Sequence, residues 1–133
     1  MIKRGILHPQ LKYVLASIGH QDYLAMVDSG YCVPLGVERI DLAFLPNIPN
    51  MLQVLDGVLD EFAVEKIILA EEIHEHAPEF LEEVKKRFPE NFPIEFVAHV
   101  ELKEKIKQSN AVIRTGDFGT HYGNMILVSG CMY

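Results

Sequence analysis

Cysteine, positive charge and long apolar runs are all scarce in this sequence, and each shortage excludes a class of protein. No apolar run approaches the roughly 20 residues that a membrane-spanning helix needs, so we expect no membrane span. The 12 Lys and Arg residues stand against 19 Asp and Glu residues, which gives a net charge of -7. This charge repels phosphate backbones and anionic membrane surfaces, so neither nucleic acid nor a membrane is an expected partner.

The two cysteines, Cys32 and Cys131, lie far apart and form no Cys-x-x-Cys motif. We expect free, buried thiols rather than a disulfide. The N-terminus carries Lys3 and Arg4, but polar residues and a proline interrupt the stretch after them, which therefore lacks the apolar segment of a secretory signal. The expected location is the cytoplasm.

Apolar residues are plentiful enough for a core, since 49% of the 133 residues are apolar and 23% are charged. Neither a linker-like stretch nor a repeat divides the chain, so we expect residues 1–133 to form a single domain. Stretches with helical spacing alternate with short apolar runs typical of buried strands. The expected helices cover residues 9–18, 50–62, 78–88 and 101–108, and the expected strands cover residues 23–28, 64–70, 94–98, 111–115 and 125–129. This alternation predicts a three-layer α/β/α fold with a mixed, mostly parallel sheet, in which the final pair of strands is the candidate for antiparallel pairing.

One candidate for acid-base chemistry is His20, which follows the helix-ending Gly19 and lies two residues before Asp22. Histidine titrates near neutrality and can both donate and accept a proton, as proton exchange on sugar oxygens requires. The alternative is a surface histidine at a helix C-terminus, where the partial negative charge favours the cation. The residues alone leave both interpretations open.

Polar residues also follow two of the expected strands. Asp28 ends the first strand, and His99 follows the third. Ligands of open α/β sheets bind beyond the carboxyl ends of the strands, where a carboxylate accepts hydrogen bonds from ligand hydroxyls. Asp28 could equally cap a turn by accepting bonds from backbone amides. Lys103 lies four residues after His99, so a helix that begins there would place both side chains on one side.

A Gly-rich segment, residues 116–124, joins the last two expected strands and carries Asp117, His121, Tyr122 and Asn124. Its glycines fit neither the Gly-x-Gly-x-x-Gly pattern nor a Walker sequence, so no nucleotide site is expected. A loop with these side chains suits hydrogen bonding to a small neutral polyol. For Tyr122, packing over the edge of the sheet is the alternative.

Carboxylates and imidazoles that could bind a metal gather between Glu71 and His76. The segment contains no His-Glu-x-x-His, and its Glu71-x-x-His74 pattern has no second copy to complete a dinuclear site. We therefore expect no metal, and interpret the segment as a solvated loop that leads into the helix at Pro78.

A set of motifs in a fixed order along the chain is more specific evidence of function than any one of these residues. The motifs are Gly19-His20-x-Asp22, Asp28-Ser29-Gly30, Arg39-Ile40-Asp41, Val64-Glu65 to Ala70-Glu71-Glu72-Ile73, His99, Ala111-Val112-Ile113-Arg114-Thr115-Gly116 and Tyr122-Gly123-Asn124. Together they resemble the D-ribose pyranase and L-fucose mutarotase family along nearly the whole chain. The resemblance implies that His20 is the proton donor and that Asp28, His99 and the segment Tyr122-Gly123-Asn124 bind the sugar. Lys103 and Asp22 are additional candidates.

The resemblance further implies an isomerase that interconverts ring forms of a free sugar without a cofactor. A base would take the anomeric proton while an acid protonates the ring oxygen, and attack of O4 on the open-chain aldehyde would turn a pyranose into a furanose. Most motifs resemble the D-ribose pyranase branch, although that branch usually has Ala at position 123 and Pro at position 121. The expected activity is that of a D-ribose pyranase, with an L-fucose mutarotase or a non-catalytic sugar-binding module as alternatives.

His20 and Asp28 would lie at opposite ends of one strand, which at about 3.3 Å per residue is too far apart to hold one small sugar. Either the loop around Gly19 folds back, or a neighbouring chain supplies half of the site, and we favour the second arrangement. Family members resemble ring-shaped oligomers. The resemblance therefore implies a homo-oligomer, a pentamer or decamer, with sites for a monosaccharide shared between subunits.

Overall fold

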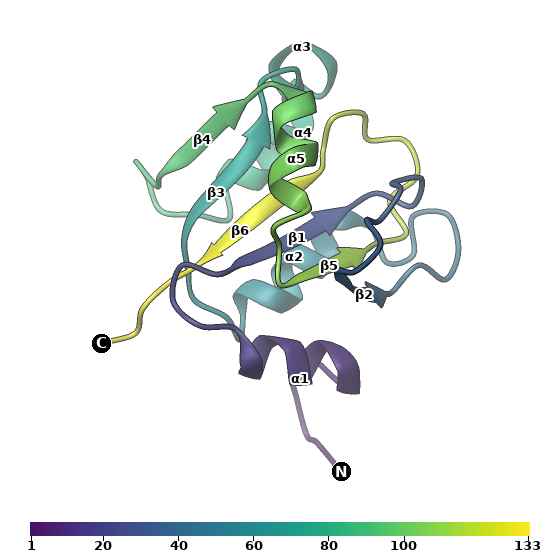
Figure 1. Cartoon of the computed structure of the whole chain (residues 1–133), viewed down its shortest axis with the longest axis vertical. Helices are drawn as coiled ribbons and strands as arrows, with labels where there is room; N and C mark the ends of the chain where they lie inside the picture. Colours follow the sequence, from purple (N-terminus) through teal and green to yellow (C-terminus); the bar gives the residue numbers. More distant parts are fainter.

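A computed structural model describes residues 1–133, and its six strands form one sheet in the order β2-β5-β1-β6-β3-β4 (Figure 1). The strands are β1 (Tyr23–Val27), β2 (Glu38–Asp41), β3 (Val64–Ala70), β4 (Ile94–Val97), β5 (Ala111–Arg114) and β6 (Met125–Ser129). The helices are α1 (Pro9–Ser17), α2 (Met51–Leu59), α3 (Ile73–His76), α4 (Pro78–Lys85) and α5 (His99–Ile106). β6 is antiparallel to its neighbours β1 and β3, and all other pairs are parallel, which confirms the mixed, mostly parallel sheet.

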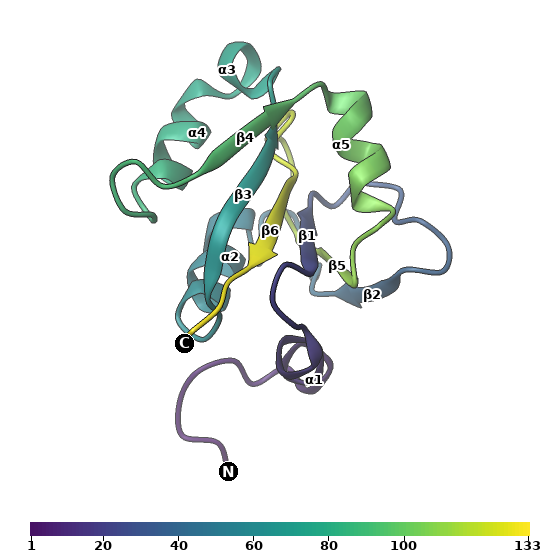
Figure 2. The same cartoon turned by 60° about the vertical axis from the view of Figure 1, so that its left-hand side comes forward.

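Helices cover both faces of the sheet (Figure 2). Leu11 of α1, Leu55 of α2 and Leu81 of α4 pack against one face. Leu102 and Ile106 of α5 pack against the other face. Because each face buries its own apolar cluster, the expected three-layer α/β/α domain is confirmed.

Two short elements lie outside the sequence prediction. β2 is an edge strand in which only Ile40 is buried, and α3 is a single helical turn in place of the expected loop. Each has one buried side chain, so neither shows an apolar period in the sequence. A third difference is that α5 begins at His99, two residues before the expected start. The carboxylate oxygens of Glu72 accept the backbone N–H of His99 at 3.0 and 3.1 Å, which satisfies one of the free amides at the helix start.

The last two strands, β5 and β6, run in opposite directions, as expected, but they do not pair with each other. β5 and β6 lie on opposite sides of β1, and β6 pairs antiparallel with β1 and β3. The Gly-rich segment between them therefore has to pass the end of β1, which is where Asp28 follows the strand. This crossing brings residues 116–124 to the carboxyl end of the central strands.

Both cysteines are free, but the prediction that they are buried is wrong. Cys32 lies in the loop after β1 and Cys131 lies in the C-terminal segment after β6, so neither belongs to a strand or helix face that points into the core. Both thiols are exposed. None of the helices has the length and apolar character that crossing a membrane requires.

Candidate functional site

A cavity of about 530 Å³ opens beside the loop after β1, the start of α5 and the Gly-rich segment. Most of the residues that line it are polar, and the full set is Asp28, Ser29, Gly30, Tyr31, His99, Lys103, Asp117, Phe118, Gly119, Thr120, His121, Tyr122 and Asn124. The cavity brings together seven of the residues singled out from the sequence, namely Asp28, His99, Lys103, Asp117, His121, Tyr122 and Asn124. They come from three segments that are distant along the chain.

Asp28 and Asn124 are tied to each other at the cavity. The backbone N–H of Asp28 donates to Oδ1 of Asn124 at 2.8 Å. Oδ1 of Asp28 accepts the N–H of Gly30 at 2.8 Å, so this carboxylate caps its own turn as well as lining the cavity. Oδ2 of Asp28 and Nδ2 of Asn124 make no hydrogen bond within the chain, which leaves one acceptor and one donor for the hydroxyl groups of a ligand.

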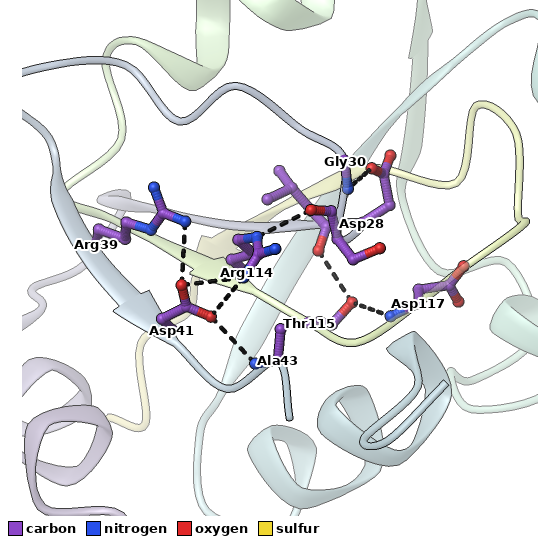
Figure 3. A network of polar contacts seen from close by, with 10 residues as sticks. Asp28, Gly30, Arg39, Asp41, Ala43, Arg114, Thr115 and Asp117 are labelled. Atoms are coloured by element: carbon purple, nitrogen blue, oxygen red, sulfur yellow. Dashed lines mark hydrogen bonds and ion pairs between the residues drawn. The ribbon is translucent and has the colours of Figure 1, made fainter. Parts of the chain in front are cut away.

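A polar network fixes the loop after β1 (Figure 3). Arg114, the last residue of β5, donates from Nε to the carbonyl oxygen of Ser29 at 2.9 Å and from Nη1 to both carboxylate oxygens of Asp41 at 2.9 and 3.0 Å. Asp41 also accepts bonds from the N–H of Ala43 and from Arg39. Burial acts to raise the pKa of Asp41, but the hydrogen bonds from Arg114, Ala43 and Arg39 outweigh burial and lower that pKa. The ionised carboxylate in turn holds Arg114 against the Ser29 carbonyl.

Thr115 and Asp117 join the start of the Gly-rich segment to β1 (Figure 3). Oγ1 of Thr115 donates to the carbonyl of Val27 at 2.9 Å, and the carbonyl of Asp117 accepts the N–H of Ser29 at 2.9 Å. The Asp117 carboxylate accepts the N–H of Thr120 at 3.1 Å and the first N–H of α2 at 3.4 Å. Asp117, a candidate ligand-binding residue in the sequence, therefore uses both carboxylate oxygens to build the loop.

Two imidazoles line the cavity, those of His99 and His121, and His99 is the one with a shifted pKa. Burial lowers its pKa, the charge of Lys103 lowers it further, and the carboxylates of Glu72 and Asp28 act in the opposite direction. The lowered pKa keeps the ring neutral at pH 7, so one ring nitrogen can accept a proton. Nδ1 of His99 is buried without a hydrogen-bond partner within the chain. A buried polar atom of this kind is expected to bond a ligand or a water molecule.

Tyr122 is held between two imidazole rings. Its ring centroid lies 4.9 Å from that of His99, in an edge-on arrangement, and 4.7 Å from that of His76. The backbone of Tyr122 has a φ of 60°, a left-handed conformation that is uncommon for a non-glycine residue and that occurs often at functional sites. His76 comes from α3, the element that the sequence did not reveal, so its contact with Tyr122 could not be predicted.

Gly123, part of the predicted sugar-binding segment, is not among the residues that line the cavity. A Cβ atom at this position would be 2.7 Å from Cγ2 of Thr120 and 3.1 Å from the ring of Phe80. The missing side chain therefore lets the Gly-rich segment pack closely. Tyr31, by contrast, lines the cavity without having been singled out from the sequence. Burial, followed by the nearby charge of Asp28, raises the pKa of Tyr31 to about 12, so its hydroxyl keeps its proton.

His20 lies at the opposite end of β1 and does not reach the cavity. The five residues of β1 alone separate the two ends by about 16 Å at the usual rise per residue. The side chain of His20 is 47% exposed, and its Nε2 is 2.8 Å from Oε2 of Glu65, the second residue of β3. Asp22 uses its carboxylate within the same loop, where Oδ2 accepts the N–H of Gly19 at 2.8 Å.

The imidazoles and carboxylates between Glu71 and His76 do not converge on one point. Nδ1 of His74 bonds the carbonyl of Glu71 at 2.9 Å, and the His74 ring packs against Phe96. His76 packs against Tyr122. No group of three or more His, Cys, Asp or Glu side chains has the arrangement of a metal site.

Comparison with known proteins gives full-length matches. The D-ribose pyranase of Geobacillus thermodenitrificans is 48% identical over 130 residues, which are 98% of this chain and 97% of that protein. The structure of Bacillus subtilis RbsD complexed with D-ribose has a TM-score of 0.93 at 39% identity and covers 100% of both chains. The fucose mutarotase of Streptococcus pneumoniae in complex with L-fucose has a TM-score of 0.80, but at 18% identity it shows only the shared fold.

The sequence profile of the RbsD / FucU transport protein family matches residues 1–132. This match covers the whole sheet, both helical layers and every residue that lines the cavity. The chain is therefore a member of the RbsD / FucU transport protein family.

Proposed function

We propose that this chain is an isomerase that interconverts the pyranose and furanose forms of D-ribose by acid-base ring opening, without a cofactor. The observation that carries the proposal is the neutral His99, whose Nδ1 has no partner, in a polar cavity that also offers a free carboxylate oxygen and a free amide. The choice of D-ribose is supported by relatives named D-ribose pyranase that are 48% and 44% identical over almost their full length.

In the proposed reaction, His99 takes the proton of the anomeric hydroxyl, and C1 becomes a carbonyl as the bond between C1 and O5 breaks. An imidazolium at His20 protonates O5. In the resulting open-chain aldehyde, O4 attacks C1 and loses its proton to His20, while the carbonyl oxygen recovers a proton from His99. No atom is gained or lost, so only the ring size changes. Asp28, Tyr122 and Asn124 hold the sugar, and Lys103 lines the same cavity.

The proposed mechanism requires His20 from a second copy of the chain. His20 and the cavity lie at opposite ends of β1, and exposed apolar side chains occur near both ends. Phe44, Leu45 and Phe118 lie around a second hollow beside the cavity, whereas Met132 and Tyr133 follow β6, whose end is bonded to the His20 loop. Contact between unlike ends is a heterologous interface, which closes into a ring when the rotation permits. We therefore propose a ring-shaped homo-oligomer, a pentamer or decamer, in which neighbouring subunits share each site.

An enzyme of this kind would adjust the ring form of free ribose before a later step consumes it. We accordingly place the protein in the cytoplasm and in ribose catabolism. A specific observation favours L-fucose as the second candidate sugar, because the segment Tyr122-Gly123-Asn124 resembles fucose mutarotases more than ribose pyranases.

The test is saturation-transfer proton NMR of unlabelled D-ribose and L-fucose with catalytic amounts of the protein. The expected result is faster exchange between the pyranose and furanose signals of ribose, and a smaller acceleration for fucose at equal concentration. Faster exchange on fucose would reassign the substrate. Saturable ribose binding without any acceleration would instead identify a sugar-binding module.

A further inference from the structure

The contact between His20 and Glu65 is not part of the cavity, although it involves the proposed acid. Nε2 of His20 and Oε2 of Glu65 are 2.8 Å apart, and their side chains are 47% and 39% exposed. His20 belongs to the loop between α1 and β1, whereas Glu65 is the second residue of β3. Because β6 lies between β1 and β3 in the sheet, the contact spans the end of β6.

The backbone of the His20 loop is fixed without Glu65. Oδ2 of Asp22 accepts the N–H of Gly19 at 2.8 Å. The carbonyl of Ser129 accepts the N–H of Gln21 at 2.9 Å, and the N–H of Ser129 donates to the carbonyl of Asp22 at 2.9 Å. These bonds determine where the Cα of His20 lies, so the bond to Glu65 restrains only the orientation of the imidazole ring.

We infer that Glu65 is a positioning residue that holds Nε2 of His20, so that His20 exchanges protons with the sugar through Nδ1. The inference rests on the proposed function and names the nitrogen that works. An ionised carboxylate only accepts hydrogen bonds, so Nε2 keeps its hydrogen whether the ring is neutral or charged. Nδ1 is then the nitrogen whose proton comes and goes.

The proton balance follows from this assignment. On ring opening, the Nδ1–H of the imidazolium gives its proton to O5, and the electron pair of the C1–O5 bond stays on O5. His20 is left neutral, with Nε2–H still donating to Glu65. On ring closure, Nδ1 takes the proton of O4 as O4 attacks C1, which restores the imidazolium. The carboxylate of Glu65 is unchanged throughout.

A neighbouring ion pair provides a matched control. Lys66, the next residue of β3, pairs with Glu95 at 3.0 Å, and both side chains are 37% exposed. Exposed ion pairs of this type contribute little to stability. Loss of either carboxylate should therefore leave the fold intact, whereas only Glu65 touches the proposed acid.

The experiment compares the wild type with E65A, E65Q and E95A by saturation-transfer NMR on D-ribose. E65A frees the ring, and misplacement of a reacting group can reduce turnover by up to about 100-fold, so we expect kcat to fall between about 10- and 100-fold. KM should stay within about twofold, because the cavity residues are untouched. E65Q keeps an acceptor oxygen without the charge and should be intermediate, and E95A should match the wild type.

A second measurement does not depend on activity. In protein labelled with 15N histidine, the Nε2 signal of His20, assigned with His20→Ala, should shift in E65A and stay in place in E95A. An active wild type with an unchanged kcat in E65A and E65Q, or with an unchanged Nε2 signal, would overturn the inference alone. A wild type that accelerates no exchange would overturn the proposed function and this inference with it.

Discussion

Lys103 is the residue whose charge contributes most to the shifted pKa of His99. Burial and the charge of Lys103 both lower the pKa of His99, whereas Glu72 and Asp28 raise it by a smaller amount. A base must be unprotonated to act, so the proposed reaction should keep its rate as the pH falls through 6.5 and lose it only near the lowered pKa of His99.

The first prediction is that Lys103→Met moves the acidic limb of the rate profile to higher pH. Removing the positive charge makes the imidazolium of His99 easier to form, so the pKa of His99 rises towards its ordinary value. The exchange rate on ribose should then fall below that of the wild type at about pH 6 and approach it at pH 8. Lys107→Met, directly after the same helix and outside the cavity, is the control. Identical profiles for the two variants would separate Lys103 from the titration of His99.

Gly123 lies so close to its neighbours that a side chain at this position would collide with them. A Cβ at position 123 would lie 2.7 Å from Cγ2 of Thr120, which is too close for real atoms. The residue before Gly123 is Tyr122 and the residue after it is Asn124, so any shift of this backbone displaces two proposed sugar contacts. The methyl group of Thr120 therefore leaves room only for glycine at position 123 in this backbone conformation.

The second prediction follows from that contact: Gly123→Ala weakens ribose binding, and adding Thr120→Ser restores it. The serine lacks the Cγ2 that the new methyl would strike, so the pair should be non-additive. Isothermal titration should show at least a severalfold loss of affinity in Gly123→Ala and recovery of most of that loss in the double variant, in which only the 3.1 Å approach to the ring of Phe80 remains. Thr120→Ser alone is the control and should bind normally. Additive losses would mean that Thr120 does not limit the side chain at position 123.

At the scale of elements, Arg114 connects two strands, β2 and β5, to the loop that follows β1. It belongs to β5, it pairs with Asp41 of β2, and it holds the carbonyl of Ser29 just beyond β1. The Arg114 side chain is 25% exposed, and each of its bonds involves a charged group, so its loss should cost more than that of a free surface arginine.

The third prediction is that Arg114→Met lowers the free energy of unfolding by about 1 to 2 kcal/mol and weakens ribose binding, because the loop after β1 loses its anchor. Arg39→Met is the matched control, since Arg39 donates to the same carboxylate but is 48% exposed and does not touch Ser29. It should change stability by less than about 0.5 kcal/mol and leave binding intact. Chemical denaturation and titration calorimetry measure both effects. Equal effects of the two substitutions would show that the Ser29 contact is unimportant.

Pro9–Ser17 and Val64–Ala70 show what sequence periodicity could predict among these elements. α1 ends at Ser17, one residue before the expected end, and β3 has the expected bounds, because a buried stripe or a buried run leaves a clear apolar pattern. Three of the four β2 residues are exposed, and α3 is one turn long, so no such pattern exists for them. The sequence pattern also did not predict which strands pair with β6, because strand order depends on contacts between distant segments.

For the candidate site, the sequence predicted where the residues lie better than it predicted what they contact. Asp28, His99 and Asn124 follow or precede apolar runs, and the carboxyl ends of parallel strands gather ligands, so their place was accessible from the sequence. The side chains that these residues contact could not be predicted from the sequence. That Glu72 caps α5, that His76 packs on Tyr122 and that Glu65 bonds His20 all depend on side chains brought together by the fold.

At the scale of the whole molecule, each chain carries the two halves of the proposed site at opposite ends. The His20 half includes Glu65 and the end of β6, and the cavity half includes His99 and Asn124. If a neighbouring chain completes each cavity, a substitution in one half leaves the other half of the same chain functional. The two kinds of defect can then be separated by mixing subunits.

The last prediction is that inactive His20→Ala and inactive Asn124→Ala chains recover activity when they are dissociated mildly, mixed in equal amounts and reassembled. An intact site needs the cavity of a His20→Ala chain beside the His20 of an Asn124→Ala chain, so random assembly gives about one quarter intact sites. Ribose exchange measured by saturation transfer should therefore return to about one quarter of the wild-type rate. Mixing Asn124→Ala with His99→Ala, which damage the same half, should restore nothing. Failure of the first mixture to recover, in oligomers that mass spectrometry shows to contain both variants, would confine the site to a single chain.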